Sequence, residues 1–206
     1  MFNHTHLPNI GLTEGLIPSE IYQALNREIV DIHTNDVGIQ KMNGCLAGQI
    51  TKEYQITKSR ELLDPYLEEM GRAYQKNWDY YPSAPRQEAN EDLKVESVWV
   101  NMQKKLEVNP LHNHDGTLSF VAWLHVPFKL EDERKVENCK NSRTVELAST
   151  FQFVYTTALG TIANCPMFVE RGWEARIVMF PAKLLHIVYP FQTSDDYRIS
   201  IAGNLY

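Results

Sequence analysis

The period of the hydrophobic pattern changes near residue 90, and this change constrains the fold more than any other feature. Before it, apolar residues recur every three or four positions, as in amphipathic helices. After it, apolar and polar residues alternate over short runs bounded by Gly, Pro, Asn or charged clusters. These runs cover residues 96–103, 119–126, 147–156, 161–169, 176–180, 184–188 and 199–205. So many short strands predict a mostly β protein, a sandwich or jelly roll.

Two helices are expected ahead of these strands. The first begins after a cap at Pro18-Ser19 and carries an apolar stripe at positions 21, 25, 29 and 32. The second begins near Ser59, with its stripe at positions 63, 67, 70, 74 and 78. Residues 44–56 between them could form either a strand or a loop. We therefore predict one domain, in which a helical annex over residues 1–92 packs on a β core over residues 93–206.

Charge and cysteine content narrow the possible partners and compartment. The formal net charge of −6 and the lack of a basic stripe argue against a nucleic-acid partner. Cys45, Cys139 and Cys165 are odd in number and widely spaced, which fits neither a disulfide framework nor a zinc-thiolate knuckle. No run of 18 apolar residues and no leader-like segment is evident, so neither membrane insertion nor secretion is expected. The expected location is the reducing cytoplasm.

The segment 128–146 interrupts the strand pattern with ten charged residues. Its polarity predicts that it lies outside the core. Two interpretations remain open, a solvated excursion or a mobile lid over a site.

Three histidines have the spacing of a metal site. His112 and His114 are two positions apart, so on a strand both imidazoles leave the same face. A third, His186, lies within an apolar strand-like run. Neutral imidazole binds Fe, Zn, Cu and Ni, and three such ligands leave coordination positions open. The other histidines, at positions 4, 6, 33 and 125, have no comparable context.

Arg198 and Ser200 predict an anion site. On a strand they share a face, while Ile199 and Ile201 point the other way. An inward-facing guanidinium is costly unless it is neutralised, and a ligand carboxylate could accept two parallel hydrogen bonds from it. An internal carboxylate partner, or an arginine that reaches the rim, remains possible.

Several motifs in order carry a resemblance to a known family: His112-x-His114, Ser119-Phe120-Val121-Ala122-Trp123-Leu124-x-x-Pro127, Phe180-Pro181-x-x-Leu184-x-His186 and Arg198-Ile199-Ser200-Ile201-x-x-Asn204. The pattern resembles the 2-oxoglutarate and Fe(II)-dependent oxygenases, and more narrowly a prolyl 4-hydroxylase-like branch found in bacteria and tailed phages. The resemblance implies a double-stranded β-helix (a cupin-like jelly roll) and a dioxygenase that hydroxylates an unidentified substrate and releases succinate and CO2. It also implies that Fe(II) is bound by His112, His114 and His186, and the far carboxylate of 2-oxoglutarate by Arg198 and Ser200.

The sequence departs from the commonest family pattern, His-x-Asp, at position 114. Asp115 follows on the opposite face of a regular strand and could be a ligand only if the chain bulges there. We favour the three-histidine set over a set that contains Asp115. Two other functions remain open: a cupin-like three-histidine metalloenzyme that does not use 2-oxoglutarate, and a noncatalytic jelly-roll module. The side chains at positions 101, 103, 123 and 155 could contact a cosubstrate, but ordinary packing explains each of them, so they stay outside the predicted site.

Overall fold

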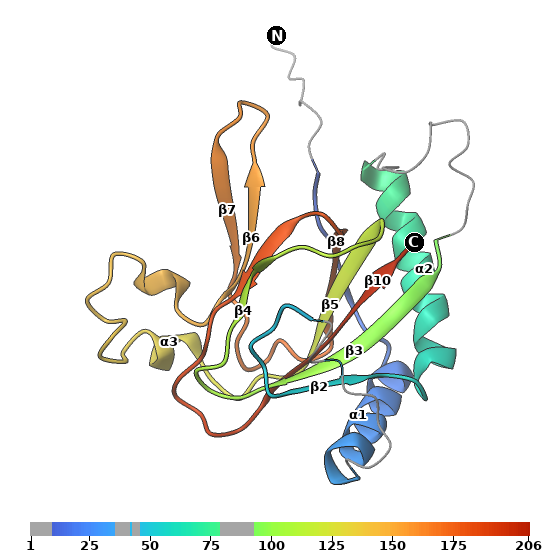
Figure 1. Ribbon diagram of the computed structural model, residues 1–206, viewed down its shortest axis with the longest axis horizontal. Helices are drawn as coiled ribbons and strands as arrows, with labels where there is room; N and C mark the ends of the chain where they lie inside the picture. Colours follow the sequence, from blue (N-terminus) through green and yellow to red (C-terminus); the bar gives the residue numbers. More distant parts are fainter. Residues whose placement is uncertain (1–9, 36–41, 43–45, 79–92) are drawn as a thin grey trace.

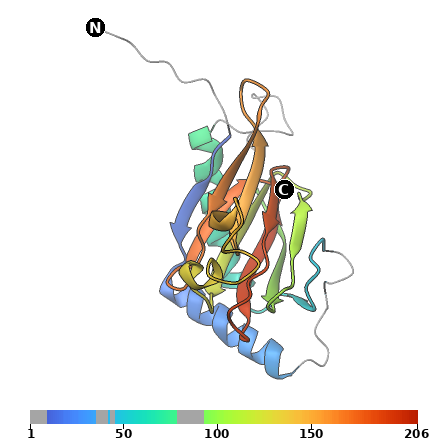
Figure 2. The same ribbon diagram turned by 90° about the vertical axis from the view of Figure 1, so that its left-hand side faces the viewer.

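The computed structural model describes residues 10–35, 42, 46–78 and 93–206, so Cys45 and the histidines at positions 4 and 6 lie outside the described residues. The chain folds into two antiparallel sheets (Figures 1 and 2). The larger sheet has the order β1 (Thr13–Leu16), β8 (Arg176–Pro181), β5 (Leu118–His125), β10 (Arg198–Leu205), β3 (Val95–Gln103), β2 (Lys52–Gln55). The smaller sheet has the order β4 (Asn109–His112), β9 (Leu185–Val188), β6 (Phe151–Thr156), β7 (Ile162–Met167).

Strands β3 to β10 form a jelly roll. Along the chain, β3, β5, β8 and β10 belong to the larger sheet, whereas β4, β6, β7 and β9 form the smaller one. Each sheet therefore receives strands from distant parts of the sequence, and the two sheets face each other. The predicted mostly β, double-stranded β-helix fold is confirmed.

The larger sheet is covered on both faces, so its central strands are buried throughout. On β5, Phe120, Ala122 and Leu124 pack in a cluster with residues of the helices, whereas Val121 and Trp123 pack between the sheets. This two-sided burial explains why the run 118–124 is apolar at nearly every position. The inward face of the larger sheet is therefore free to line a site, while its outer face holds the helices.

Helices α1 (Ser19–Thr34) and α2 (Arg60–Trp78) lie against the outer face of the larger sheet (Figure 1). The predicted stripes are buried: Ile21, Leu25, Ile29 and Ile32 in α1, and Leu63, Leu67, Met70 and Tyr74 in α2. Trp78, the last stripe residue, remains 37% exposed. The expected annex also contributes two edge strands, β1 and β2, and β2 shows that residues 52–55 of the undecided segment are strand. No helix in the described part of the chain combines the length and apolar character needed to cross a membrane.

Glu28 joins α1 to the start of α2. Its carboxylate is buried and accepts hydrogen bonds from the backbone N–H groups of Thr57 at 2.7 Å, Lys58 at 2.9 Å and Ser59 at 2.7 Å. Burial raises the pKa of the Glu28 carboxyl, but the hydrogen bonds to residues 57–59 outweigh burial and leave its pKa below the ordinary value. The Glu28 carboxylate is therefore ionised in the folded protein at neutral pH, and its hydrogen bonds hold α1 to the start of α2.

Replacing Glu28 by Ala is expected to lower the free energy of unfolding by about 2–4 kcal/mol, because three backbone N–H groups, that of Ser59 buried and those of Thr57 and Lys58 partly buried, lose a charged acceptor. Since the pKa of Glu28 is lowered on folding, its stabilisation is present above the unfolded pKa near 4.5 and disappears as pH falls through the folded value. Urea unfolding at pH 7 and at low pH measures both effects. Arg27→Ala, at an exposed position of the same helix, should change the free energy by less than about 0.5 kcal/mol.

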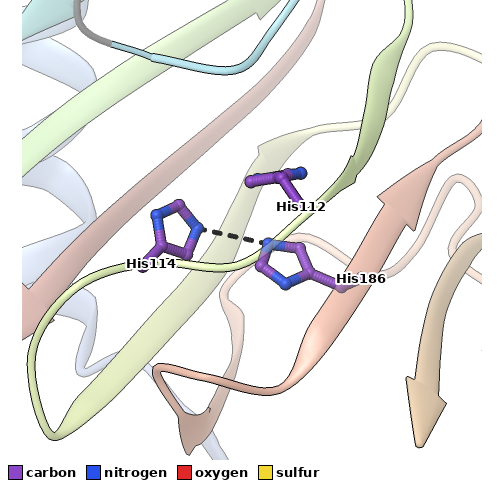
Figure 3. Close-up of side chains that lie close together, drawn as sticks. All are labelled: His112, His114 and His186. Atoms are coloured by element: carbon purple, nitrogen blue, oxygen red, sulfur yellow. Dashed lines mark hydrogen bonds between the residues drawn. The ribbon is translucent and has the colours of Figure 1, made fainter.

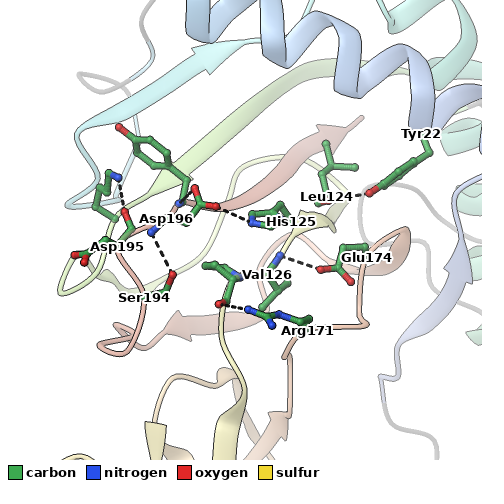
Figure 4. A network of polar contacts seen from close by, with 12 residues as sticks. Tyr22, Leu124, His125, Val126, Arg171, Glu174, Ser194, Asp195 and Asp196 are labelled. Carbon is green, nitrogen blue, oxygen red and sulfur yellow. Dashed lines mark hydrogen bonds and ion pairs between the residues drawn. The ribbon is translucent and has the colours of Figure 1, made fainter. Parts of the chain in front are cut away.

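Hydrogen bonds also fasten the end of β5, beside the start of β10 (Figure 4). The Tyr22 hydroxyl of α1 donates to the carbonyl oxygen of Leu124 at 2.9 Å. The Val126 N–H donates to the Glu174 carboxylate at 3.2 Å. His125 lies 3.3 Å from the carboxylate of Asp196, two residues before β10. The first two contacts hold the end of β5, and the third, between exposed side chains, lies beside the start of β10.

Candidate metal centre

Three histidine side chains meet between the two sheets. His112 ends β4 and His186 lies on β9, and the two are Cα partners in the antiparallel pairing of these strands. His114 lies just beyond β4, and its N–H donates to the carbonyl oxygen of Ala182 at 2.8 Å. One ring nitrogen of each histidine lies within 4.8 Å of those of the other two (Figure 3). We expected His112 and His114 to share a strand; they converge although the strand ends at His112.

Backbone carbonyls set the orientation of two of the rings. The Nδ1 atoms of His112 and His186 lie 2.6 Å from the carbonyl oxygen of Pro110 and 3.0 Å from that of Leu184, respectively. We assign the proton to Nδ1 in both rings, because a carbonyl oxygen can only accept. Their Nε2 lone pairs are then available to a metal ion, the usual arrangement for ligating histidines.

The spacing of the nitrogens fits a first-row metal ion. The Nε2 atoms of His114 and His186 are 3.2 Å apart. Two nitrogens about 2.1 Å from one ion and at right angles to each other would be separated by about 3.0 Å. Imidazole is a suitable ligand for iron, and three of them leave sites for other ligands. The residues present therefore fit an Fe(II) centre.

Burial keeps the three imidazoles neutral. Burial lowers the pKa of His112, and burial together with repulsion from His112 lowers the pKa of His114 to about 4 and that of His186 to about 3. His186, only 3% exposed, stacks on Phe151 with ring centres 5.5 Å apart. Neutral rings present lone pairs instead of protons to an ion at pH 7.

Metal affinity is therefore expected to change by less than about threefold between pH 6 and 8 and to fall only below about pH 5, because metal competes with few bound protons above that range. By the same shifts, the unfolded chain binds more protons than the folded chain between about pH 4 and 6.5, so the metal-free protein should gain stability as pH rises. Chelator competition with Mn(II) and thermal unfolding at each pH measure the two effects. A tenfold loss of affinity per pH unit starting near 6.5 would contradict neutral buried ligands.

Asp115 lies apart from the histidine cluster. Its carboxylate is 87% exposed and forms an ion pair with Lys183 at 2.8 Å. This ion pair holds the pKa of Asp115 below its ordinary value. The chain makes no turn that would bring this carboxylate to the three imidazoles.

Arg198 is fully enclosed on the inward face of the larger sheet. It is 3% exposed, and its guanidinium carbon lies 5.6 Å and 5.5 Å from the ring centres of Phe128 and Phe191. Its four hydrogen bonds within the described part of the chain go to neutral oxygens: the Gln103 side chain, by two bonds, and the carbonyls of Ser149 and Tyr189. Burial lowers the pKa of Arg198 to about 9, and nearby Glu133 opposes this shift. A buried cation with neutral direct partners suits an incoming anion.

Arg198 and the histidines line one cavity of about 40 Å³. Its walls include two rows on neighbouring strands, with Asn101 and Gln103 on β3 opposite Ser200 and Arg198 on β10. The predicted shared face of Arg198 and Ser200 is thus present, and Ile201 packs on the helix side as expected. Trp123 also lines this cavity, whereas Tyr155 lines a separate, apolar one.

The charged segment 128–146 contributes to the site in a way that its composition does not indicate. Glu133, in α3 (Leu130–Glu133), is fully buried and accepts hydrogen bonds from the Ser149 hydroxyl and from the N–H groups of Gln192 and Thr193, each at 2.8 Å. Phe128 and Leu130 are buried as well, so the expectation that this segment lies outside the core is wrong at these positions. Glu133 fastens the two stretches whose carbonyls accept from Arg198.

Comparison with known proteins places the chain in a family. The family model described as "Putative 2OG-Fe(II) oxygenase" matches residues 97–204, just over half of the chain. No curated protein matches the sequence.

Solved structures of low sequence identity share the fold. A prolyl-4-hydroxylase from Pseudomonas putida is 11% identical, with a TM-score of 0.55 over 95% of this chain and 92% of that chain. The non-heme alpha ketoglutarate dependent epimerase SnoN from nogalamycin biosynthesis is 10% identical, with a TM-score of 0.57 over 94% and 75%. HygX from Streptomyces hygroscopicus, solved with nickel, 2-oxoglutarate and hygromycin B, is 11% identical, with a TM-score of 0.52 over 94% and 81%.

The matched segment contains the three clustered histidines together with Arg198 and Ser200. The cluster offers ligands suited to iron, and the cavity beside it ends at a buried cation. The chain belongs to the 2OG-Fe(II) oxygenase family: it is an oxidoreductase whose metal cofactor is Fe(II) and whose cosubstrate is 2-oxoglutarate.

Proposed function

We propose that this oxygenase hydroxylates a small polar substrate, with release of succinate and CO2. In this proposal His112, His114 and His186 bind Fe(II), and Arg198 and Ser200 bind the far carboxylate of 2-oxoglutarate. The observation that carries the proposal is the single cavity that the histidine cluster shares with Arg198 and Ser200. A diacid bound there can reach the metal with one end and the guanidinium with the other.

Bound Fe(II) and 2-oxoglutarate supply the activation of dioxygen and the transfer of one oxygen atom to a C–H bond of the substrate. The residues of the chain hold the cosubstrate in position and keep water out of the cavity. Trp123, Phe151 and Phe180 line the cavity, and the stacked pair Phe128 and Phe191 lies against the guanidinium. These rings exclude water from the place where the cosubstrate is consumed, which limits side reactions.

A second cavity supports the assignment of a substrate side. It has a volume of about 330 Å³ and shares Trp99, Asn109, His112 and His114 with the first cavity. Asn113, Asn204 and Tyr206 add polar groups to its wall. The histidines thus separate a buried cosubstrate chamber from a roomier polar chamber, as a two-substrate reaction at one metal requires.

We also propose that the enzyme works in the cytoplasm. Cys139 and Cys165 are free thiols in the structure. A reducing compartment would keep these thiols free and would keep iron in the ferrous state.

The test is turnover of 2-oxoglutarate by the purified protein with Fe(II) and ascorbate. Succinate is expected to form slowly even without the hydroxylated substrate, and 2-oxoglutarate should bind only when metal is present. Metal-independent binding, or no binding, would contradict the proposal. Candidate small polar compounds can then be ranked by how much they accelerate succinate formation.

A further inference from the structure

Gln103 occupies the edge of Arg198 that a carboxylate would use. The Gln103 Oε1 atom accepts from Nε of Arg198 at 3.0 Å and from Nη2 at 2.6 Å. One amide oxygen thus fills the side-on fork, the geometry in which guanidinium grips a carboxylate. The two residues are Cα partners in the pairing of β3 and β10 and are both buried, so the contact is built into the sheet.

Two of the other three N–H donors of Arg198 are held by backbone groups that cannot leave. Arginine has five N–H donors. Nη1 donates to the carbonyl oxygen of Ser149 at 3.2 Å, and the second Nη2 hydrogen donates to that of Tyr189 at 2.9 Å. Both carbonyls belong to the backbone, and Glu133 fastens their neighbourhood. The acceptor from Gln103, by contrast, is a side chain, so it can leave Arg198 by rotation about its own bonds without a change in β3; among the described residues its amide nitrogen donates only to the Glu107 carbonyl.

The Gln103 side chain also limits the space beside Arg198. The cavity between the histidines and Arg198 has a volume of about 40 Å³, which is room for a few water molecules. Moving the Gln103 amide would enlarge the cavity at the end where Arg198 lies and would expose the fork at the same time.

We propose that the Gln103 side chain occupies the Arg198 donors that bind the far carboxylate of 2-oxoglutarate, and that this carboxylate displaces Gln103 when 2-oxoglutarate binds. The inference rests on the proposed binding role of Arg198. The exchange replaces a neutral acceptor by an ionised one, which forms the stronger hydrogen bonds. Gln103 keeps the buried guanidinium hydrogen-bonded before binding, and its displacement reduces the net affinity for 2-oxoglutarate. Gln103 is therefore a positioning residue that sets cosubstrate affinity.

Three variants test this inference by anaerobic calorimetry of 2-oxoglutarate binding to the Fe(II)-loaded protein. Gln103→Met keeps the length of the side chain and removes the competing oxygen, so the Kd should fall about fivefold or more. Gln103→Glu places a permanent carboxylate on the fork, so the Kd should rise about thirtyfold or more while Tm rises. Gln152→Met removes the amide of another buried glutamine, on β6, and should leave the Kd within about twofold of the wild type.

A monocarboxylic 2-oxo acid separates displacement from general disturbance of the site. 2-Oxobutyrate can chelate the metal but has no far carboxylate for Arg198, so its Kd should be the same in wild type and Gln103→Met. If Gln103→Met does not fold, Gln103→Asn carries the same test, because the shortened amide cannot reach both nitrogens. Weaker 2-oxoglutarate binding by Gln103→Met or Gln103→Asn, or undiminished binding by Gln103→Glu, overturns the inference.

Failure of the inference differs from failure of the proposed function. If wild-type protein binds 2-oxoglutarate and loses it in Arg198→Met, the assignment of Arg198 stands whatever the glutamine variants do. If Arg198→Met binds 2-oxoglutarate as tightly as wild type, Arg198 is not the anion site of the proposed function. Displacement of Gln103 from Arg198 is then excluded as well.

Discussion

Replacing His186 by alanine is expected to abolish metal binding and 2-oxoglutarate turnover. The ring offers one of three clustered nitrogens, and its position is fixed by strand β9, by the Leu184 carbonyl and by stacking on Phe151. With two imidazoles left, we expect the metal Kd to rise more than about a hundredfold, because the loss of one ligand removes several kcal/mol of binding free energy. Metal content after dialysis and succinate formation measure the two losses.

The controls for His186→Ala separate ligand loss from unfolding. Removing a buried ring also leaves a cavity, at a cost of about 2–4 kcal/mol of stability, so circular dichroism must first show that the variant is folded. His125→Ala removes another imidazole, one that is 43% exposed and pairs with Asp196 instead of facing the cluster. This variant should keep its metal and its activity. A folded His186→Ala protein that retains one tightly bound ion would refute the three-histidine centre.

Replacing Arg198 by methionine is expected to raise the Kd of 2-oxoglutarate about a hundredfold or more while leaving metal affinity within about threefold. Methionine fills much of the space beside the stacked rings of Phe128 and Phe191 but removes the donors that a carboxylate would use. The loss of a buried, charge-assisted pair costs about 2–5 kcal/mol of binding free energy. Arg198→Lys keeps a charge without the planar fork, so it should fall between wild type and Arg198→Met.

The matched control is Arg176→Met at the start of β8. Arg176 is exposed and lies over the ring of Trp173, with its guanidinium carbon 5.0 Å from the ring centre. Its loss should leave 2-oxoglutarate affinity unchanged. Equal affinity in Arg198→Met and wild type, measured by calorimetry on metal-loaded protein, would show that the far carboxylate is bound elsewhere.

The sequence predicted the parts of this site that depend on local periodicity. Two-residue alternation placed Arg198 and Ser200 on the inward face of β10, and the order of the motifs indicated the family. Asn101 and Gln103 were named as possible cosubstrate contacts but left outside the predicted site, and both line the cavity. What the alternation could not show is that Gln103 and Arg198 are direct cross-strand partners, because that pairing joins residues far apart in the chain.

Burial of polar groups was harder to predict. Glu133 lies in a charged run and looks solvated from its neighbours, yet its partners are Ser149, Gln192 and Thr193, the last two about sixty residues downstream. Such a carboxylate is buried only because tertiary contacts bring N–H and O–H donors to it. The edge strands β1 and β2 were also not assigned from the sequence, because neither four-residue segment shows a clear alternation of apolar and polar residues.

The pairing of His112 with His186 across β4 and β9 has a consequence for how the enzyme acquires its ion. Two of the three proposed ligands lie directly opposite each other on neighbouring strands, so the backbone pairing fixes the separation of their Cα atoms once β4 and β9 pair. Binding of the metal ion then requires only small rotations of the imidazole rings and no refolding of loops. We therefore expect iron to bind and dissociate without unfolding of the barrel.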